Sequence, residues 1–460
     1  MNYLQLLATL IFLAAFALIA SERIDKTRVA LAGAALMLVL HLVRQQTAFS
    51  GSPEFPGAGV DWNTIFLLFG TMIIVAVARH TGLFEWLAVR SAKLVGAHPV
   101  GLILVLSLVT AVISAFLNNV TTVLLIVPVV LVVTRALETD PIPFVIPISI
   151  ASNIGGTATL IGHPPNIMIG SAAGFTFVDF LRYDFPPTLL VFGAFCLIVW
   201  LALTPRLRVS AEDRARVLAL ADADVIRDPR LLRKCLFVLT LAIVGFVVCG
   251  YVGLEPATVA LAAGVLLLLM LGNHPHIPGH EGEYHWYADI EWSVLLFFIG
   301  LFVMVSALVE LGVVQVFSRF LVSVTGGNTI AMALALLWFS AIMAGLMDNI
   351  PFVATMNAML LNLPHQLART SVGGAVPDLH GPQMMPLWWA LSLGACLGAN
   401  FTIIGSATHI VTAGLCARDG HPISFRRFLK YGIPITVVSI LICTLYLWFR
   451  FLRVLPPGLG

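Results

Sequence analysis

Residues 152–166 read SNIGGTATLIGHPPN, a polar and glycine-rich stretch inside a long apolar segment. A second such stretch, GANFTIIGSATH at 398–409, interrupts another apolar segment. Within a membrane, irregular backbone survives only where it is buried in protein or lines a cavity, because its polar groups need partners. We therefore interpret both stretches as breaks in membrane-spanning helices.

The composition of the 460-residue chain is that of a membrane protein. Hydrophobic residues make up 59% and charged residues only 10%, whereas soluble chains carry roughly 25% charged residues. The net charge of +2 provides no basic face, so no nucleic-acid partner is expected. The six cysteines lie in or beside apolar segments without a CxxC pair, and we predict neither a disulfide framework nor a structural zinc site.

Apolar segments of sufficient length predict the membrane topology. Those long enough to cross about 30 Å of hydrocarbon run at about 3–20, 28–43, 61–80, 142–173, 185–204, 235–253, 257–272, 291–309, 386–416 and 431–453. Two further pairs of apolar arms, 98–117 with 121–137 and 327–347 with 350–363, are joined by short polar tips. Hydropathy alone leaves open whether these arms cross the membrane or form re-entrant hairpins.

Basic residues predict the orientation. Residues 205–234 contain eight lysines and arginines, so we place this linker in the cytoplasm. Ten crossings then put 19 of the 25 basic residues on the cytoplasmic side and both termini outside. We expect a multi-pass protein of the cell membrane.

The chain contains an internal duplication. Matching segments recur 230 or 243 residues apart: Asp61-Trp62 as Glu291-Trp292, Asn118-Asn119-Val120 as Asp348-Asn349-Ile350, and Thr159, Gly162 and Ile167 as Thr402, Gly405 and Ile410. Five crossings per copy would invert the second copy in the membrane, an arrangement typical of secondary transporters. The predicted fold is an all-α polytopic membrane protein with two inverted repeats, 1–204 and 235–460, joined by the linker 205–234. Each repeat has five transmembrane helices, one re-entrant hairpin and a helix broken at the midplane.

The two hairpin tips and two breaks form the predicted solute site. Four half-helix N-termini would meet there, each with about +0.5 charge and free amide donors, which suits an anion or an oxygen-rich neutral solute. Asn119, Asn349 and Ser406 are the expected N-caps, with Pro164 and Pro351 as first helical residues. The candidate substrate-binding residues are Asn118, Asn119, Thr121, Thr122, Asn153, Thr157, Thr159, Asn166, Asn349, Asn400, Thr402, Ser406 and Thr408.

Three titratable residues in the tips and breaks are candidates for proton or ion coupling. Asp348 is the only carboxylate there, and it either caps the following helix or binds the coupling proton or cation. His163 and His409 have a side chain that titrates near neutral pH and could carry protons. The alternative for each histidine is a hydrogen-bonded packing role.

No motif for an enzyme, cofactor or nucleotide is present. The sequence lacks a GxSxG, P-loop or Rossmann fingerprint, so an ion gradient or a partner ATPase would supply the energy. The loop 273–290 holds four histidines, but without the spacing of a zinc protease, and we interpret it as solvated. The expected partners are a small inorganic solute, a coupling proton or Na⁺, and the lipid bilayer, with a homodimer left open.

Two stretches resemble a known family. Ser114–Pro128 (SAFLNNVTTVLLIVP) and Ser152–Gly170 (SNIGGTATLIGHPPNIMIG) are similar to the arsenite permease/Na⁺–H⁺ antiporter (ArsB/NhaD) family, in particular its P-protein-like members, within the ion transporter superfamily. This superfamily also contains citrate and dicarboxylate carriers. The resemblance implies a scaffold domain, a mobile transport domain and solute binding at the tips and breaks.

The chain departs from that family at two positions. His163 stands where the family has an aspartate in Gly-Asp-Pro-Pro-Asn, and His409 stands where an asparagine is frequent. Na⁺ prefers oxygen ligands to histidine nitrogen, which weakens sodium coupling as an interpretation. The leading hypothesis is a secondary transporter that exports arsenite or antimonite against proton influx by alternating access. The alternatives are Na⁺/H⁺ antiport, carboxylate or inorganic anion transport, and a channel-like protein.

Overall fold

The computed structural model describes residues 2–21, 23–205, 207, 209–219, 226, 228–271, 286–370 and 376–455. These ranges are helical and contain no β-strand. Among them, eight helices are long and apolar enough to cross a membrane. They are α1 (Tyr3–Ser21), α4 (Trp62–Ala78) with η1 (Arg79–Thr81), α7 (Asn119–Ala136), α11 (Phe185–Leu203), α13 (Pro229–Val252), α15 (Trp292–Glu310), α17 (Thr329–Leu346) and α21 (Phe425–Arg450) with η3 (Leu452–Val454). The prediction of an all-α polytopic membrane protein is confirmed.

The remaining helices are shorter or more polar, and several complete the hairpins and breaks. They are α2 (Lys26–Val39), α3 (Gln45–Ser50), α5 (Leu83–Leu94), α6 (Pro99–Ser114), α8 (Ile142–Thr157), α9 (Pro164–Ala173), α10 (Phe177–Tyr183), α12 (Ala211–Ala219), α14 (Pro256–Leu271), η2 (Trp286–Asp289), α16 (Val313–Thr325), α18 (Asn349–Thr370), α19 (Met385–Gly398) and α20 (Ala407–Arg418). The two predicted breaks are present: α8 ends before α9 begins, and α19 ends before α20 begins.

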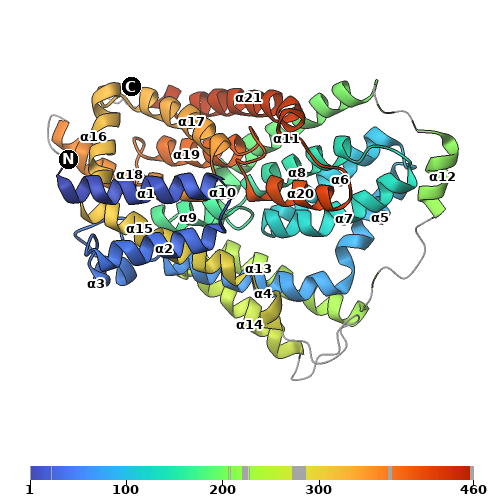
Figure 1. Cartoon of the computed structure of the whole chain (residues 1–460), viewed down its shortest axis with the longest axis horizontal. Coiled ribbons are helices and arrows are strands. Elements are labelled where there is room, and N and C mark those ends of the chain that lie inside the picture. The colour runs from blue at the N-terminus through green and yellow to red at the C-terminus, as the bar shows by residue number, and fades with distance from the viewer. Residues whose placement is uncertain are drawn as a thin grey trace.

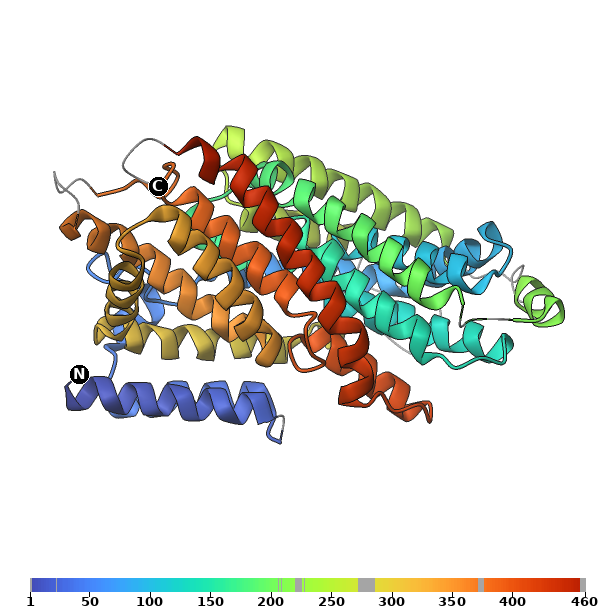
Figure 2. The same cartoon turned by 90° about the horizontal axis from the view of Figure 1, so that it is seen from above.

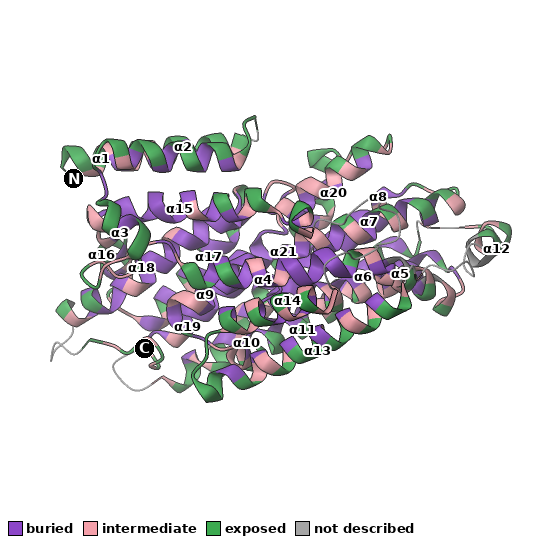
Figure 3. Ribbon diagram, turned by 90° about the horizontal axis from the view of Figure 1, so that it is seen from below, coloured by how far each residue is buried: buried purple, intermediate pink, exposed green. Residues whose placement is uncertain are grey.

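The molecule is elongated, and most helices run along its length (Figure 1). Both termini lie at one end, and α12 of the linker lies at the other (Figures 1 and 2). Figure 3 shows buried residues gathered in the interior, with exposed residues on the outward faces of α1 and α13. Linker residues 206, 208, 220–225 and 227, and the four loop histidines within 272–285, lie outside the described residues. Which end faces the cytoplasm stays a prediction.

Helices from the two halves of the chain pack against each other with close backbone contacts. A Cβ atom added to Gly70 on α4 would lie 2.4 Å from the carbonyl carbon of Ala260 on α14. A Cβ atom on Gly300 of α15 would lie 2.8 Å from the carbonyl carbon of Ala30 on α2. Both partners of the second contact are offset by 230 residues from those of the first, as an internal duplication predicts.

The hairpin arms pack on the helices that lead to the breaks. On α8, a Cβ atom at Gly155 would lie 2.1 Å from the carbonyl oxygen of Ala111 on α6. On α19, a Cβ atom at Gly398 would lie 2.3 Å from the Cα atom of Ala341 on α17. These contacts hold each tip close to a break. The exact repeat boundaries and the inversion of one copy in the membrane remain predictions.

Candidate functional site

At the first hairpin tip, helix α7 begins and the side-chain amide of Asn119 points into the protein interior. Asn118 is the N-cap, and its Oδ1 accepts a hydrogen bond from the backbone N–H of Val120 at 3.0 Å. Asn119, the residue expected to be the cap, is instead the first helical residue. Its buried side chain donates from Nδ2 to Oδ1 of Asn153 on α8 at 2.8 Å. The tip therefore contacts the helix that precedes the first break.

Asn153 joins the first tip to the second break. Its Oδ1 also accepts a hydrogen bond from the hydroxyl of Ser406 at 3.3 Å, and its Nδ2 donates to Oδ1 of Asn400 at 3.1 Å. The same Nδ2 lies 3.1 Å from Nε2 of His409. We call the buried residues Asn119, Asn153, Asn400, Ser406 and His409 the first polar cluster. Residues from both halves of the chain make up this cluster.

His409 is held on both ring nitrogens. Nδ1 lies 2.6 Å from the hydroxyl of Ser149, and Nε2 lies 3.1 Å from Oδ1 of Asn400. Two polar atoms of this region, Nδ2 of Asn400 and Oγ1 of Thr408, are buried and have no hydrogen-bond partner within the described residues. The first polar cluster thus has an unused amide donor on Asn400, and the neighbouring Thr408 has an unused hydroxyl; both are available to a solute.

A second polar cluster joins the second tip to the first break. Nδ2 of Asn349 lies 3.4 Å from Nε2 of His163, and Nδ1 of His163 lies 3.1 Å from Sγ of Cys396. The Cys396 thiol and the Ser392 hydroxyl both contact Oδ1 of Asn166, at 3.1 and 2.9 Å. All five residues are buried, and we call them the second polar cluster. Cys396 and Ser392, both on α19, were not among the predicted site residues.

The two clusters occupy corresponding positions in the two copies. At the offset of 243 residues, Asn153 corresponds to Cys396 and Asn166 to His409, while the serines in contact with them correspond as Ser149 and Ser392. This offset was the signal that could have identified Cys396 and Ser392 from the sequence. The side chains differ between the copies, so the two clusters offer different donors and acceptors.

Most of the predicted threonines stabilise the backbone of the tips and breaks. Their hydroxyls hydrogen-bond to carbonyl oxygens: Thr122 to Asn118, Thr157 to Asn153, Thr159 to Ala115 and Thr402 to Gly345. Asn166 has a similar role on its amide side, because its Nδ2 donates to two carbonyl oxygens of residues 157 and 159, each at 3.0 Å. These groups shape the irregular segments, and their polar atoms are already engaged.

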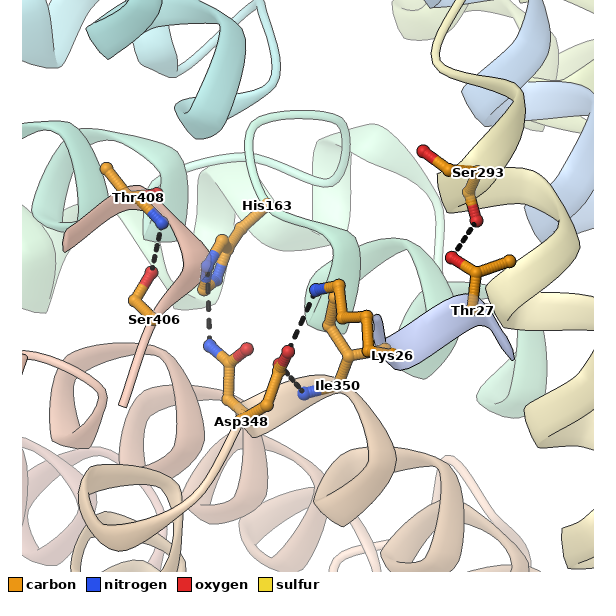
Figure 4. A network of polar contacts seen from close by, with 9 residues as sticks. Lys26, Thr27, His163, Ser293, Asp348, Ile350, Ser406 and Thr408 are labelled. Atoms are coloured by element: carbon orange, nitrogen blue, oxygen red, sulfur yellow. Dashed lines mark hydrogen bonds and ion pairs between the residues drawn. The ribbon is translucent and has the colours of Figure 1, made fainter. Parts of the chain in front are cut away.

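Asp348 has two partners at the second tip. Its Oδ1 accepts a hydrogen bond from the backbone N–H of Ile350 at 3.1 Å, so Asp348 caps α18 in place of the expected Asn349. Its Oδ2 lies 3.0 Å from Nζ of Lys26 at the start of α2 (Figure 4). The next residue, Thr27, donates to the carbonyl of Ser293 at 2.8 Å and anchors that end of α2. The ion pair was not predicted, because the sequence identified Lys26 only as one of the 19 basic residues expected on the cytoplasmic side.

A cavity lies beside each hairpin tip. Thr121 donates to Oε1 of Glu291 at 3.1 Å beside a cavity of about 20 Å³ at the first tip. A cavity of about 310 Å³ lies at the second tip, where Asp25, Lys26 and Asp348 contribute the charged part of an otherwise apolar lining. Among the described residues, no group of three or more His, Cys, Asp or Glu side chains could hold a metal ion. The site is built from amides, hydroxyls, histidines, the Cys396 thiol and the Lys26–Asp348 ion pair, with the Glu291 carboxylate beside the first tip.

Helix breaks, buried amide clusters and the predominance of membrane-spanning helices together define a transporter of the polytopic membrane class. The family model described as citrate transporter matches residues 16–394. The chain belongs to the citrate transporter family, which lies within the ion transporter superfamily.

Relatives extend over nearly the whole chain. An uncharacterised transporter of Mycobacterium tuberculosis is 42% identical over 452 residues, which cover 97% of this chain and 99% of that protein. A 46 kDa membrane protein of Mycobacterium leprae is 39% identical and covers 98% of this chain and 99% of its own length. The human P protein is 31% identical over 96% of this chain and 59% of its own length. The resemblance to P proteins is confirmed, while the more specific assignment to the ArsB/NhaD family stays a prediction.

A solved structure has the same fold. The crystal structure of the YdaH transporter from Alcanivorax borkumensis, described as having an unusual topology, aligns with a TM-score of 0.59 at 14% identity. The alignment covers 98% of this chain and 99% of the YdaH chain. At this identity the match establishes the fold alone.

Proposed function

We propose that the chain is a secondary active transporter that moves a small, oxygen-rich anion across the membrane by alternating access. The observation that carries the proposal is the hydrogen-bond path from Asn119 through Asn153 to Asn400, which joins a hairpin tip to a break from the other half of the chain. Movement of the tips and breaks against the scaffold would carry this hydrogen-bond path with them. A solute bound there would then meet opposite sides of the membrane in turn.

The donors available in the site favour an anion. The helices α7, α9, α18 and α20 all begin at the tips and breaks, and their N-termini carry partial positive charge. The unused Nδ2 of Asn400 adds a side-chain donor. Lys26 lines the cavity of about 310 Å³ together with Asp25 and Asp348, so it becomes available to an anion when protonation of Asp348 breaks their ion pair. A carboxylate or an inorganic oxyanion is the solute class that these groups suit. The citrate transporter family to which the chain belongs supports the carboxylate class.

Arsenite or antimonite efflux against proton influx is the second candidate. Apart from the Lys26–Asp348 pair, the polar clusters contain uncharged amides, hydroxyls and a thiol with two histidines, and these groups also suit neutral arsenous acid. This candidate would correspond to the ArsB/NhaD-like assignment predicted from the sequence. Na⁺/H⁺ antiport has less support, because His163 supplies nitrogen where the resembling family has a carboxylate.

We assign proton coupling to Asp348, with His163 and His409 as further carriers. In the proposed cycle the scaffold stays fixed while the tips and breaks move, the linker 205–234 lies in the cytoplasm and both termini lie outside. Protonation of Asp348 would cancel its attraction to Lys26 and free the second tip from α2. Proton binding and tip movement would thereby be linked.

A flux assay tests the proposal. Purified protein in liposomes is given citrate, arsenite or Na⁺ under an imposed pH gradient. The proposal expects the gradient to drive citrate or another small oxyanion against its own concentration difference. Arsenite movement alone would favour the second candidate, and flux that does not respond to the gradient would indicate a channel.

A further inference from the structure

A second carboxylate, outside the tips and breaks, is buried next to the second polar cluster. Asp184 lies between α10 and α11, and its side chain is fully buried. Its Oδ2 lies 2.5 Å from Oγ of Ser392, a member of that cluster. Its Oδ1 is buried without a hydrogen-bond partner, and Asp184 forms no ion pair with any residue that the structure describes.

The hydrogen bonds around Ser392 require one proton more than Ser392 can supply. Its hydroxyl oxygen lies within hydrogen-bond distance of both Oδ2 of Asp184 and Oδ1 of Asn166, at 2.5 and 2.9 Å. A hydroxyl has a single proton to donate. If Asp184 were ionised, both of these oxygens would be acceptors, and one short oxygen–oxygen contact would contain no proton.

The orientation of Asn166 is fixed, so the missing proton cannot come from its amide. Nδ2 of Asn166 donates to the carbonyl oxygens of Thr157 and Thr159, each at 3.0 Å. Its Oδ1 must therefore face Ser392 and the Cys396 thiol. Asp184 is the remaining source of a proton.

We propose that Asp184 is a proton-binding residue of this transporter, protonated in the present conformation, and that its charge controls the second polar cluster through Ser392. This proposal rests on the proposed function and adds a coupling residue to it. With Asp184 protonated, its Oδ2–H donates to Ser392 and Ser392 donates to Asn166. When the proton leaves to water in another conformation, the Ser392 hydroxyl turns to the carboxylate, and Asn166 Oδ1 keeps only the Cys396 thiol.

Among the described residues, no cation forms an ion pair with Asp184. The titratable groups that face it from the packed helices are the thiols of Cys396 on α19 and Cys443 on α21, and the phenol of Tyr446 on α21. The nearby cations Arg182 and Arg450 both lie over the ring of Tyr183, with 5.5 and 5.2 Å from the guanidinium carbon to the ring centroid. The helices α6 and α8, which also pack on α11, contain no charged residue. Burial without a cation makes the ionised form of a carboxylate costly, and a protonated carboxyl avoids that cost.

Asp184 is a positioning residue in this scheme, because it acts on the cluster through Ser392. From Asn166 the contacts continue through Cys396 to His163 and then to Asn349 at the second tip. A change of charge at Asp184 therefore reaches the tip that bears Asp348 without direct contact. Proton binding at Asp184 and solute binding at the clusters would be coupled by this chain.

Infrared spectroscopy of the purified protein tests the protonation state without any transport assay. The Asp184→Asn variant keeps a donor to Ser392 but removes the carboxylic acid, so the wild type minus variant spectrum should contain a carbonyl band of a protonated, buried carboxyl. Asp378→Asn, at an exposed loop residue, is the matched control and should give no such band. In Ser392→Ala the band should persist at a shifted frequency, because its hydrogen-bond partner is gone. Absence of the band in the Asp184→Asn comparison would overturn the proposal.

Transport then tests the coupling role. In liposomes, Asp184→Asn should lose pH-gradient-driven accumulation and the pH dependence of transport, while exchange of internal for external solute is retained. Full gradient-driven accumulation by Asp184→Asn would overturn the coupling role even if the infrared band is present. If the wild type itself shows no gradient-driven flux, the proposed function fails, and the infrared result still decides whether Asp184 holds a proton.

Discussion

Lys26 Nζ lies 3.0 Å from Oδ2 of Asp348, so an ion pair joins the first turn of α2 to the second hairpin tip. The Asp348 side chain is only 10% exposed and that of Lys26 is 29% exposed. Separating a largely buried pair leaves charges without partners, which is costly. A tip that moves relative to α2 must therefore either carry Lys26 with it or lose the charge on Asp348.

Asp348→Asn separates the role of the carboxylate as the cap of α18 from its role as a titratable charge paired with Lys26. The amide oxygen can still accept the hydrogen bond from the Ile350 N–H, while the charge and the titration are removed. We expect the variant to lose pH-gradient-driven accumulation and to keep solute exchange, both measured in liposomes. Full proton-driven transport would mean that Asp348 only caps α18, and coupling would then be assigned to His163 and His409.

Lys26→Gln is the companion to that variant. It removes the cation whose attraction to Asp348 links proton binding to movement of the second tip, so we expect a loss of accumulation similar to that in Asp348→Asn. Near wild-type accumulation by Lys26→Gln would show that the ion pair is not needed for coupling.

The close contact at Gly155 predicts a stability effect that does not depend on the solute. In Gly155→Ala, the new Cβ atom would lie 2.1 Å from the carbonyl oxygen of Ala111, and α8 must shift away from α6. Overpacking of this kind costs about 1–3 kcal/mol. Gly193→Ala on α11 is the matched control, because its Cβ atom would meet nothing within 4 Å. Thermal unfolding in detergent should show a lower midpoint for Gly155→Ala only, and equal midpoints would contradict the packing described.

Cys396 offers a test of the second polar cluster. Cys396→Ser keeps a donor for Oδ1 of Asn166 and a partner for Nδ1 of His163. Cys396→Val has a similar volume but leaves both atoms without that partner, and an unsatisfied buried polar group costs about 1–3 kcal/mol. We expect flux to be retained by the serine variant and strongly reduced in the valine variant. Equal flux from the two would remove Cys396 from the site.

The sequence predicted the irregular segments because their residue types are unusual inside apolar runs. The break after α8 and the N-cap Ser406 could be predicted because glycine, proline and serine have local backbone preferences that favour helix ends. The caps of α7 and α18 were predicted one residue too late. At α7 the side-chain oxygens of Asn118 and Asn119 both accept a hydrogen bond from the Val120 N–H, and at α18 the Asp348 carboxylate accepts that of Ile350.

Partnerships between distant segments could not be derived in the same way. Lys26 and Asp348 are 322 residues apart, and the sequence alone does not bring α2 against the second tip. In the sequence, Asp184 follows Arg182 and Tyr183 and would be expected in an exposed loop. In the structure, Ser392 of α19 contacts its carboxylate. The available signal was an acid at the start of a long apolar segment, but its burial is a property of the tertiary packing.

We propose that solute binds where the tips meet the breaks, at Asn119 and Asn349. Measuring pH-gradient-driven flux in liposomes for Asn119→Ala and Asn349→Ala tests this, with size-exclusion elution and unfolding temperature measured on the same preparations. These truncations remove the amides that reach Asn153 and His163. We predict that both variants elute as the wild type does and transport no solute. Wild-type flux in both variants would contradict it and exclude the hairpin tips from the site.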